Sequence, residues 1–196
     1  MMKGKLVLVL GGSRSGKSEF AEKIAAQMGE RVIYIATAAV LDDEMAERVR
    51  LHRIRRPQLW ETVEEEKNVL AVLQKGRQGD VFILDCVTIW LTNLLLDKNN
   101  SSPEVSLAKK KEYILEQAVK LANTVETGLH LIAVSNEVGQ GLVPENSLGR
   151  VFRDLSGKVN QIIAARAEQV FLTVAGIPVD IKSLAPAGME CLNNGC

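Results

Sequence analysis

The sequence predicts an α/β fold in which a mostly parallel central sheet is covered by helices on both faces. Two observations predict it: short apolar runs alternate with longer segments of helical period, and a glycine-rich turn follows the first run. The runs lack polar alternation, which is typical of strands buried on both faces. With 196 residues, 46% of them hydrophobic, the chain has room for one compact domain and no second one.

Five apolar runs of four to six residues account for the strands. They are rich in β-branched and large apolar side chains, which favour strands over helices at this length. We predict strands over residues 6–10, 31–36, 81–84, 129–134 and 169–174.

Helical segments separate these strands. Apolar residues recur at spacings of three and four in segments 18–28, 107–125 and 151–167, so each is expected to pack one face on the sheet. A further helix is predicted over 42–56, because acidic residues begin it, arginines end it and Pro57 stops it. The polar segment 97–103, DKNNSSP, is expected to be a loop.

The domain is expected to span residues 1–182, followed by an irregular tail over 183–196 that contains Cys191 and Cys196. Two thiols without further ligands make a poor metal site. Three cysteines cannot all pair and no apolar run has the length of a bilayer span, so we expect a cytoplasmic protein without a membrane span. Lys+Arg and Asp+Glu both number 24, and this balance argues against a nucleic-acid surface.

The segment GGSRSGKS (11–18) is a complete G-x-x-x-x-G-K-[ST] pattern between a predicted strand and a predicted helix. Its glycines let backbone N–H groups turn toward an anion, and the helix adds its positive dipole end. A lysine at this position binds the β- and γ-phosphates, and the following hydroxyl binds Mg²⁺. The sequence therefore predicts a P-loop NTPase fold that binds a nucleoside triphosphate through Gly11, Gly12, Ser13, Arg14, Ser15, Gly16, Lys17 and Ser18.

A P-loop enzyme needs an acid near the metal, at the end of a neighbouring buried strand. Asp85 follows the apolar run 81–84, so Ser18 and Asp85 are the predicted Mg²⁺ ligands; the alternative is that Asp85 only starts a turn. Thr88 stands where a GTPase switch would have glycine, and no N-K-x-D guanine-binding motif occurs. These absences favour a transferase that acts on a small molecule.

His52 lies among arginines on the predicted 42–56 helix. It shares one face with three of them: counted from Arg48, His52, Arg55 and Arg56 follow at spacings of four, seven and eight residues. The cations disfavour a protonated imidazole and attract a triphosphate. Such a histidine can attack the α-phosphorus and hold a covalent nucleotidyl group, but a solvated basic helix is the alternative. His130, which opens a predicted strand, is expected to be structural.

The sequence resembles the bifunctional adenosylcobinamide kinase / adenosylcobinamide-phosphate guanylyltransferase family of cobalamin biosynthesis. Four stretches carry the resemblance: 11–18, 34–64, 85–95 and 136–182. The spacings H-R-x-x-R-P-x-x-W-x-T-V-E and N-E-V-G-x-G-x-V-P-E within them are far more specific than the P-loop.

The resemblance implies two reactions. ATP or GTP phosphorylates the hydroxyl of the aminopropanol arm of adenosylcobinamide; GTP then donates GMP to an enzyme histidine, and the phosphorylated corrinoid takes up the GMP to give adenosylcobinamide-GDP. The resemblance also implies a RecA-like fold and a homotrimer with active sites between subunits.

Carried over by position, the resemblance makes His52 the guanylylated histidine, with Lys17 as the other catalytic residue. It adds these nucleotide-contacting residues: Thr37, Ala38, Ala39, Arg53, Ile54, Arg55, Arg56, Glu64 and Asp85. This sequence departs from some relatives at Leu51, where they have a second histidine, and at Asp85, where they have glutamate. Glu137 is a candidate general base for the kinase step, or a residue that holds the NEVG turn in shape.

Two other functions stay open at this point. One is a monofunctional small-molecule P-loop kinase in which His52 only binds phosphate. The other is a RecA-like nucleotide-dependent binding module that assembles on DNA, against which the balanced charge speaks.

Overall fold

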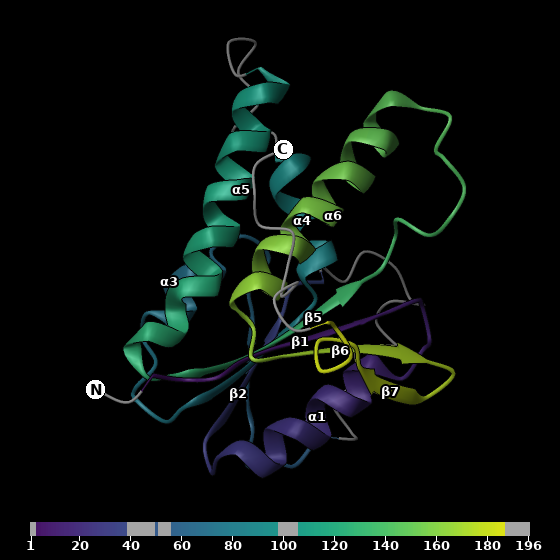
Figure 1. Cartoon of the computed structure of the whole chain (residues 1–196). Coiled ribbons are helices and arrows are strands. Elements are labelled where there is room, and N and C mark those ends of the chain that lie inside the picture. Colours follow the sequence, from purple (N-terminus) through teal and green to yellow (C-terminus); the bar gives the residue numbers. More distant parts are fainter. Residues whose placement is uncertain (1–2, 39–49, 51–55, 98–105, 187–196) are drawn as a thin grey trace.

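The computed structural model describes residues 3–38, 50, 56–97 and 106–186, and these form one seven-stranded sheet in the order β3-β2-β4-β5-β1-β6-β7 (Figure 1). Strands β1 to β6 pair in parallel, and β7 pairs with β6 in the antiparallel sense. The mostly parallel sheet predicted from the sequence is therefore confirmed. The strands are β1 Leu6–Gly11, β2 Val32–Ala36, β3 Glu61–Glu64, β4 Val81–Asp85, β5 His130–Asn136, β6 Gln169–Val174 and β7 Ile177–Asp180.

Helices cover both faces of the sheet, as predicted, with α1 on one face and α4, α5 and α6 on the other (Figure 1). The helices are α1 Lys17–Met28, α3 Val69–Leu73, α4 Val87–Leu95, α5 Leu107–Asn123 and α6 Ser147–Arg166, with a 3₁₀ turn η1 at Thr124–Thr127. The predicted helix over 42–56 lies outside the described residues except at Arg50 and Arg56, and so does the loop after Asp97. Among the described helices, none is long and apolar enough to cross a membrane.

Four elements were not predicted from the sequence, namely β3, β7, α3 and α4, and α6 begins four residues earlier than predicted. The strands β3 and β7 have only four residues each, and α3 has only five, so their periodicity is short. The helix α4, VTIWLTNLL, is apolar nearly all round because it is covered on several sides, and this hides the 3.6-residue period.

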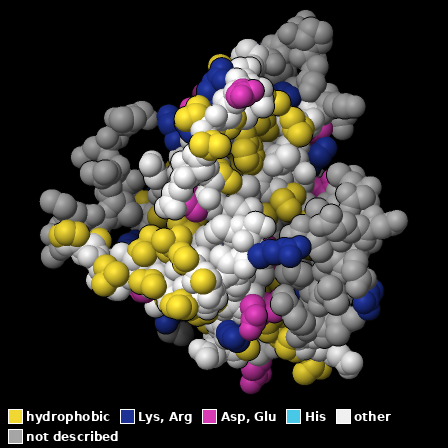
Figure 2. Space-filling model, turned by 90° about the vertical axis from the view of Figure 1, so that its right-hand side faces the viewer, with side chains coloured by type: hydrophobic (Ala, Val, Ile, Leu, Met, Phe, Trp, Pro, Cys, Tyr) yellow, Lys and Arg dark blue, Asp and Glu magenta, His cyan; other side chains and the backbone are white. Residues whose placement is uncertain are grey.

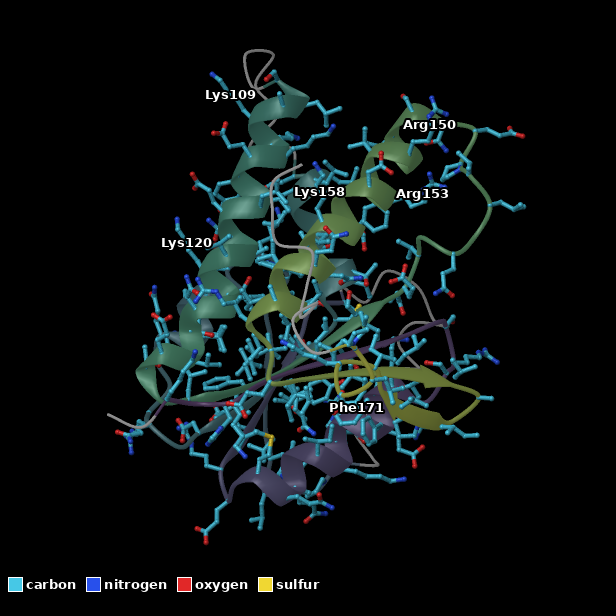
Figure 3. All side chains as sticks on the ribbon, viewed as in Figure 1. Lys109, Lys120, Arg150, Arg153, Lys158 and Phe171 are labelled. Carbon is cyan, nitrogen blue, oxygen red and sulfur yellow. The ribbon has the colours of Figure 1, made fainter. Side chains whose placement is uncertain are left out.

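Alternate side chains of the strands divide the core into two layers. Val7 and Val9 of β1 face α1, while Leu6, Leu8 and Leu10 face the larger helical layer. The residues of α1 that are buried against the sheet include two alanines, Ala21 and Ala25, whose small side chains let the helix approach closely. Phe171 points from β6 toward α1 (Figure 3), where it meets the Phe20 ring edge-on with centroids 4.9 Å apart.

The functional residues lie where the parallel strands end, along the carboxyl-terminal side of the sheet. β5 lies between β4 and β1, with Val134 opposite Asp85 and Asn136 opposite Gly11. Ligands of open parallel sheets bind outside the carboxyl ends of the strands, in the crevice where the chain connections of two neighbouring strands run in opposite directions. In this strand order, only β5 separates β1, which leads into the P-loop, from β4, which ends at Asp85.

Candidate functional site

The P-loop connects β1 directly to α1. Arg14 and Gly16 adopt positive φ angles of 56° and 93°, which turns the backbone back on itself before the helix. The N-cap residue of α1 is Gly16, which has no side chain that could cap the helix. A helix amino terminus that begins in this way is the kind of site that binds an anion, as the sequence pattern predicts.

Lys17 lies across the loop rather than in solvent. The residue is 9% exposed, and its Nζ donates a hydrogen bond to the carbonyl oxygen of Gly12 at 2.9 Å. A buried ammonium is stable only when it is well paired. Phosphate oxygens in the loop would give this ammonium charged partners.

The turn of the β6–β7 hairpin packs against the P-loop, a contact that was not predicted from the sequence. Gly176 N–H donates to the carbonyl oxygen of Ser15 at 2.9 Å, and Ala175 and Gly176 form a two-residue turn with φ angles of 51° and 82°. A Cβ on Gly16 would lie 3.2 Å from Gly176 Cα, so the two backbones are in close contact. The hairpin thus fixes the curvature of the P-loop.

Gly11→Ala tests how tightly this loop is packed. Its Cβ would lie 2.4 Å from Ser15 Oγ and 2.6 Å from the carbonyl oxygen of Thr173, so the loop must shift. At about 1–3 kcal/mol for such overpacking, we expect triphosphate affinity to fall about 5- to 150-fold, measured by titration with a fluorescent GTP analogue. Gly157→Ala, whose Cβ meets nothing within 4 Å, is the matched control and should bind as the wild type does. Equal affinity in the two variants would show that the loop tolerates the shift.

Asp85 ends β4 beside the P-loop, and its carboxylate is oriented by a buried tyrosine. The Tyr34 hydroxyl donates to Asp85 Oδ2. Burial and the Asp85 charge raise the pKa of Tyr34 well above its usual range, so the phenol keeps the proton that it donates. Asp85 Oδ1 is then the oxygen that remains for a metal ion or its water. Together with the Ser18 hydroxyl at the start of α1, this is a set of hard oxygen donors that suits Mg²⁺.

Thr37, which follows β2, is hydrogen-bonded to Cys86, which follows Asp85 at the end of β4. Thr37 is fully buried, and its Oγ1 both accepts from Cys86 N–H at 2.8 Å and donates to the Cys86 carbonyl at 2.9 Å. Burial, followed by the Asp85 charge, raises the pKa of the Cys86 thiol to about 11. The thiol is therefore protonated at neutral pH and has no nucleophilic role there.

Arg56 is anchored by three contacts rather than exposed to solvent. Its guanidinium lies 3.3 Å from the centre of the Tyr34 ring, and its Nε lies 3.7 Å from Glu22 Oε1 on α1. It also donates from Nη1 to Thr62 Oγ1 at 3.4 Å, and the side chain is only 7% exposed. The end of the segment that carries His52 is thus fixed to the helix that begins in the P-loop.

The structure brings most of the predicted site residues to one edge of the sheet. The P-loop residues, Thr37, Ala38 and Asp85 lie at the ends of β1, β2 and β4, and Glu64 ends β3 opposite Ala36. Ala39, His52, Arg53, Ile54 and Arg55 lie outside the described residues.

Glu137, the candidate general base, and His130, which was expected to be structural, both have structural contacts. Glu137 Oε1 accepts from Gly139 N–H at 2.8 Å, which holds the turn after β5 in shape. His130 Nδ1 accepts from Lys5 N–H at 3.0 Å and so has the structural contact expected of it. Tyr34, Asn136 and Thr173 were not predicted as site residues. Tyr34 and Thr173 lie within apolar runs, and Asn136 is the first residue of the N-E-V-G-x-G-x-V-P-E spacing, which carries the family resemblance but does not by itself assign a role to its asparagine.

Comparison with known proteins gives a consistent result. A family model described as cobinamide kinase / cobinamide phosphate guanyltransferase matches residues 7–181. The chain is 43% identical over 176 residues to the bifunctional adenosylcobalamin biosynthesis protein CobP of Pseudomonas aeruginosa, with 89% of this chain and 96% of that protein covered. It is 40% identical over 181 residues to the bifunctional adenosylcobalamin biosynthesis protein CobU of Escherichia coli, with 90% and 99% covered.

Among solved structures, the fold is similar to that of an ATPase from a bacterial type III secretion system. The TM-score is 0.58 at 10% sequence identity, and the match covers 96% of this chain and 60% of that protein's length. A likeness at this identity concerns the fold alone, and it confirms the predicted P-loop NTPase architecture.

Proposed function

The chain belongs to the cobinamide kinase / cobinamide phosphate guanyltransferase family, and from that membership we propose that a single P-loop site serves both reactions in turn. It is a bifunctional enzyme of adenosylcobalamin biosynthesis. One reaction transfers the γ-phosphoryl group of ATP or GTP to the hydroxyl of adenosylcobinamide. The other transfers GMP from GTP to the resulting phosphate.

We propose that His52 carries the GMP between GTP and the corrinoid. An imidazole nitrogen of His52 forms a bond to the α-phosphorus, the bond from that phosphorus to the α–β bridging oxygen breaks, and pyrophosphate leaves. A phosphate oxygen of the corrinoid then attacks the same phosphorus and breaks the nitrogen–phosphorus bond. The product is adenosylcobinamide-GDP, and the imidazole returns to its starting state.

The anchor at Arg56 is the observation that carries this proposal. Its contacts with Tyr34 and Glu22 join the His52 segment to α1 and, through Tyr34, to Asp85. Four residues of extended chain span at most about 14 Å, which limits how far His52 can lie from Arg56. The remaining proposed nucleotide contacts are Ala39, Arg53, Ile54 and Arg55 of the same segment, with Thr37, Ala38 and Glu64 at the ends of β2 and β3.

The P-loop can serve both reactions because it binds the β-phosphate, which both reactions require. Lys17 and the backbone N–H groups of the loop bind the β-phosphate, on whose two sides the reacting phosphorus atoms lie. Asp85 and Ser18 are the proposed Mg²⁺ ligands. When bound, the ion neutralises charge on the phosphate oxygens.

We further propose that the enzyme is a cytoplasmic homotrimer whose catalytic domain spans residues 1–182. The family resemblance motivates the trimer, and exposed apolar side chains on the face shown in Figure 2 support an interface. Val174 and Ile177 of the β6–β7 hairpin are 61% and 65% exposed.

Two labels in one experiment test the bifunctional assignment. With adenosylcobinamide as acceptor, we expect the label of γ-labelled GTP to appear in the phosphorylated corrinoid and to be retained in the GDP-linked corrinoid. The label of α-labelled GTP should appear in the GDP-linked corrinoid alone. Chromatography of the corrinoid products gives the measurement. A monofunctional kinase would transfer only the γ-label, and a DNA-assembling ATPase would transfer neither.

A further inference from the structure

Asn136 lies at the carboxyl-terminal end of β5, a strand in the middle of the sheet, beside the P-loop. It is the last residue of β5, directly opposite Gly11, where the P-loop begins. Its main chain is held from two helices: its N–H donates to Thr88 Oγ1 of α4 at 2.7 Å, and its carbonyl accepts from Asn160 Nδ2 of α6 at 3.4 Å. The position of this residue is therefore fixed independently of its side chain.

The Asn136 amide is not used by the fold. In the part of the chain that the structure describes, its Oδ1 is buried and has no hydrogen-bond partner. The adjacent polar groups are paired with one another, since Ser135 Oγ donates to Asn160 Oδ1 at 2.8 Å and lies 3.3 Å from Thr88 Oγ1. A buried amide oxygen without a donor costs free energy, and such exceptions call for a functional reason.

Strand alternation places the Asn136 side chain on the side of the phosphates. Ile132 and Val134 belong to the core layer that faces α1, so Asn136 emerges on that same side of the sheet. Ile83 lies in this layer too, and Asp85, two residues later, therefore shares the side. Asn136 lies one strand, about 4.8 Å, from Gly11 and two residues, about 6.6 Å, beyond the level of Asp85.

A triphosphate bound in the P-loop would place its terminal phosphate near this location. The P-loop lysine and the metal held by the strand-end acid both act on the β- and γ-phosphates. An amide between these groups can donate from Nδ2 to a phosphoryl oxygen and accept at Oδ1 from an incoming hydroxyl. The α-phosphorus, at which GMP transfer occurs, lies on the other side of the β-phosphate.

We propose that Asn136 is a catalytic residue of the phosphoryl-transfer reaction alone, an inference that rests on the proposed bifunctional activity. With a triphosphate bound, its side chain turns so that Nδ2 donates to a γ-phosphoryl oxygen and Oδ1 accepts from the corrinoid hydroxyl. The hydroxyl oxygen forms a bond to the γ-phosphorus, and the bond to the β–γ bridging oxygen breaks. The nucleoside diphosphate leaves and the hydroxyl proton passes to solvent, while the amide orients both groups without exchanging a proton.

Asn136→Ala tests this role by separating the two activities. We expect kcat for phosphorylation of adenosylcobinamide to fall about 100-fold, the usual loss for one donor to a transition-state oxygen. KM for the triphosphate should stay within about threefold, because an interaction made only in the transition state lowers kcat. GMP transfer to corrinoid that has been phosphorylated beforehand should proceed at the wild-type rate.

Asn123→Ala is the matched control. Asn123 Oδ1 is also buried and without a hydrogen-bond partner in the described structure, but it lies at the end of α5. Both its activities should match the wild type. The near-isosteric Asn136→Asp keeps the volume of the side chain and should lose phosphorylation as well, since it removes the donor and adds charge next to the phosphates.

The outcomes are distinct. Unchanged phosphorylation in both Asn136 variants overturns the proposal, and so does an equal loss of both activities, which indicates a structural role. A wild-type protein that forms neither corrinoid product rejects the proposed function itself and this role with it.

Discussion

His52→Ala is expected to lose GMP transfer by more than about 10³-fold and to keep phosphorylation of adenosylcobinamide within a few-fold of the wild type. The reason is that a covalent carrier has no substitute once its nucleophile is removed, whereas the γ-phosphoryl group passes directly to the substrate hydroxyl. The variant therefore separates the two reactions in the direction opposite to that of Asn136→Ala.

Covalent labelling gives the decisive measurement. The wild type is incubated with α-labelled GTP without corrinoid, and the protein is then tested for label that is labile in acid and stable in base, as a phosphorus–nitrogen bond is. His130→Asn is the matched control, because His130 is the chain's only other histidine and asparagine retains an acceptor for Lys5 N–H. Label on His52→Ala, or none on His130→Asn, would contradict the assignment of His52.

Lys17→Ala is expected to reduce both activities, each by about 10²- to 10³-fold. Lys17 Nζ already lies in the loop, at 2.9 Å from the Gly12 carbonyl, where it can bind the β-phosphate that both reactions require. Charge-assisted hydrogen bonds are about twice as strong as neutral ones, so the loss of this ammonium weakens the grip on the triphosphate before either bond is broken.

Lys23→Ala provides the control for Lys17→Ala on the same helix. Lys23 is 69% exposed and pairs with Glu19 at 2.9 Å on the surface of α1, where an ion pair contributes little. Both activities should be unchanged when rates are measured with saturating corrinoid and varied GTP. Normal labelling of His52 in Lys17→Ala would show that GMP transfer uses a second triphosphate site.

The fold was predictable where a local pattern carries it. The five long strands, α1 and α5 follow from apolar runs and helical periodicity, and the P-loop follows from eight consecutive residues between a strand and a helix. The position of Asp85 was predictable because a P-loop enzyme needs an acid at the end of a neighbouring buried strand, and Asp85 directly follows the apolar run 81–84. The short strands β3 and β7 were not, since four residues do not establish a period.

The contacts that support the site were not predictable, because they join residues far apart in the chain. The bond from Tyr34 to Asp85 spans 51 residues, and the contact between Gly176 N–H and the Ser15 carbonyl connects a hairpin near the end of the described chain to a loop near its start. Nothing in the sequence near Arg56 shows that its guanidinium packs on Tyr34 and Glu22.

The sequence by itself determined the chemistry of this protein: a loop that binds phosphate, an acid at a strand end and a histidine among arginines. These follow from residue type and short spacing, which act through local backbone geometry. Only the tertiary structure decided which side chains are used by the fold and which are left for substrate. That distinction depends on strand order and register, which place Asn136 opposite Gly11 with a buried amide oxygen that no described group satisfies.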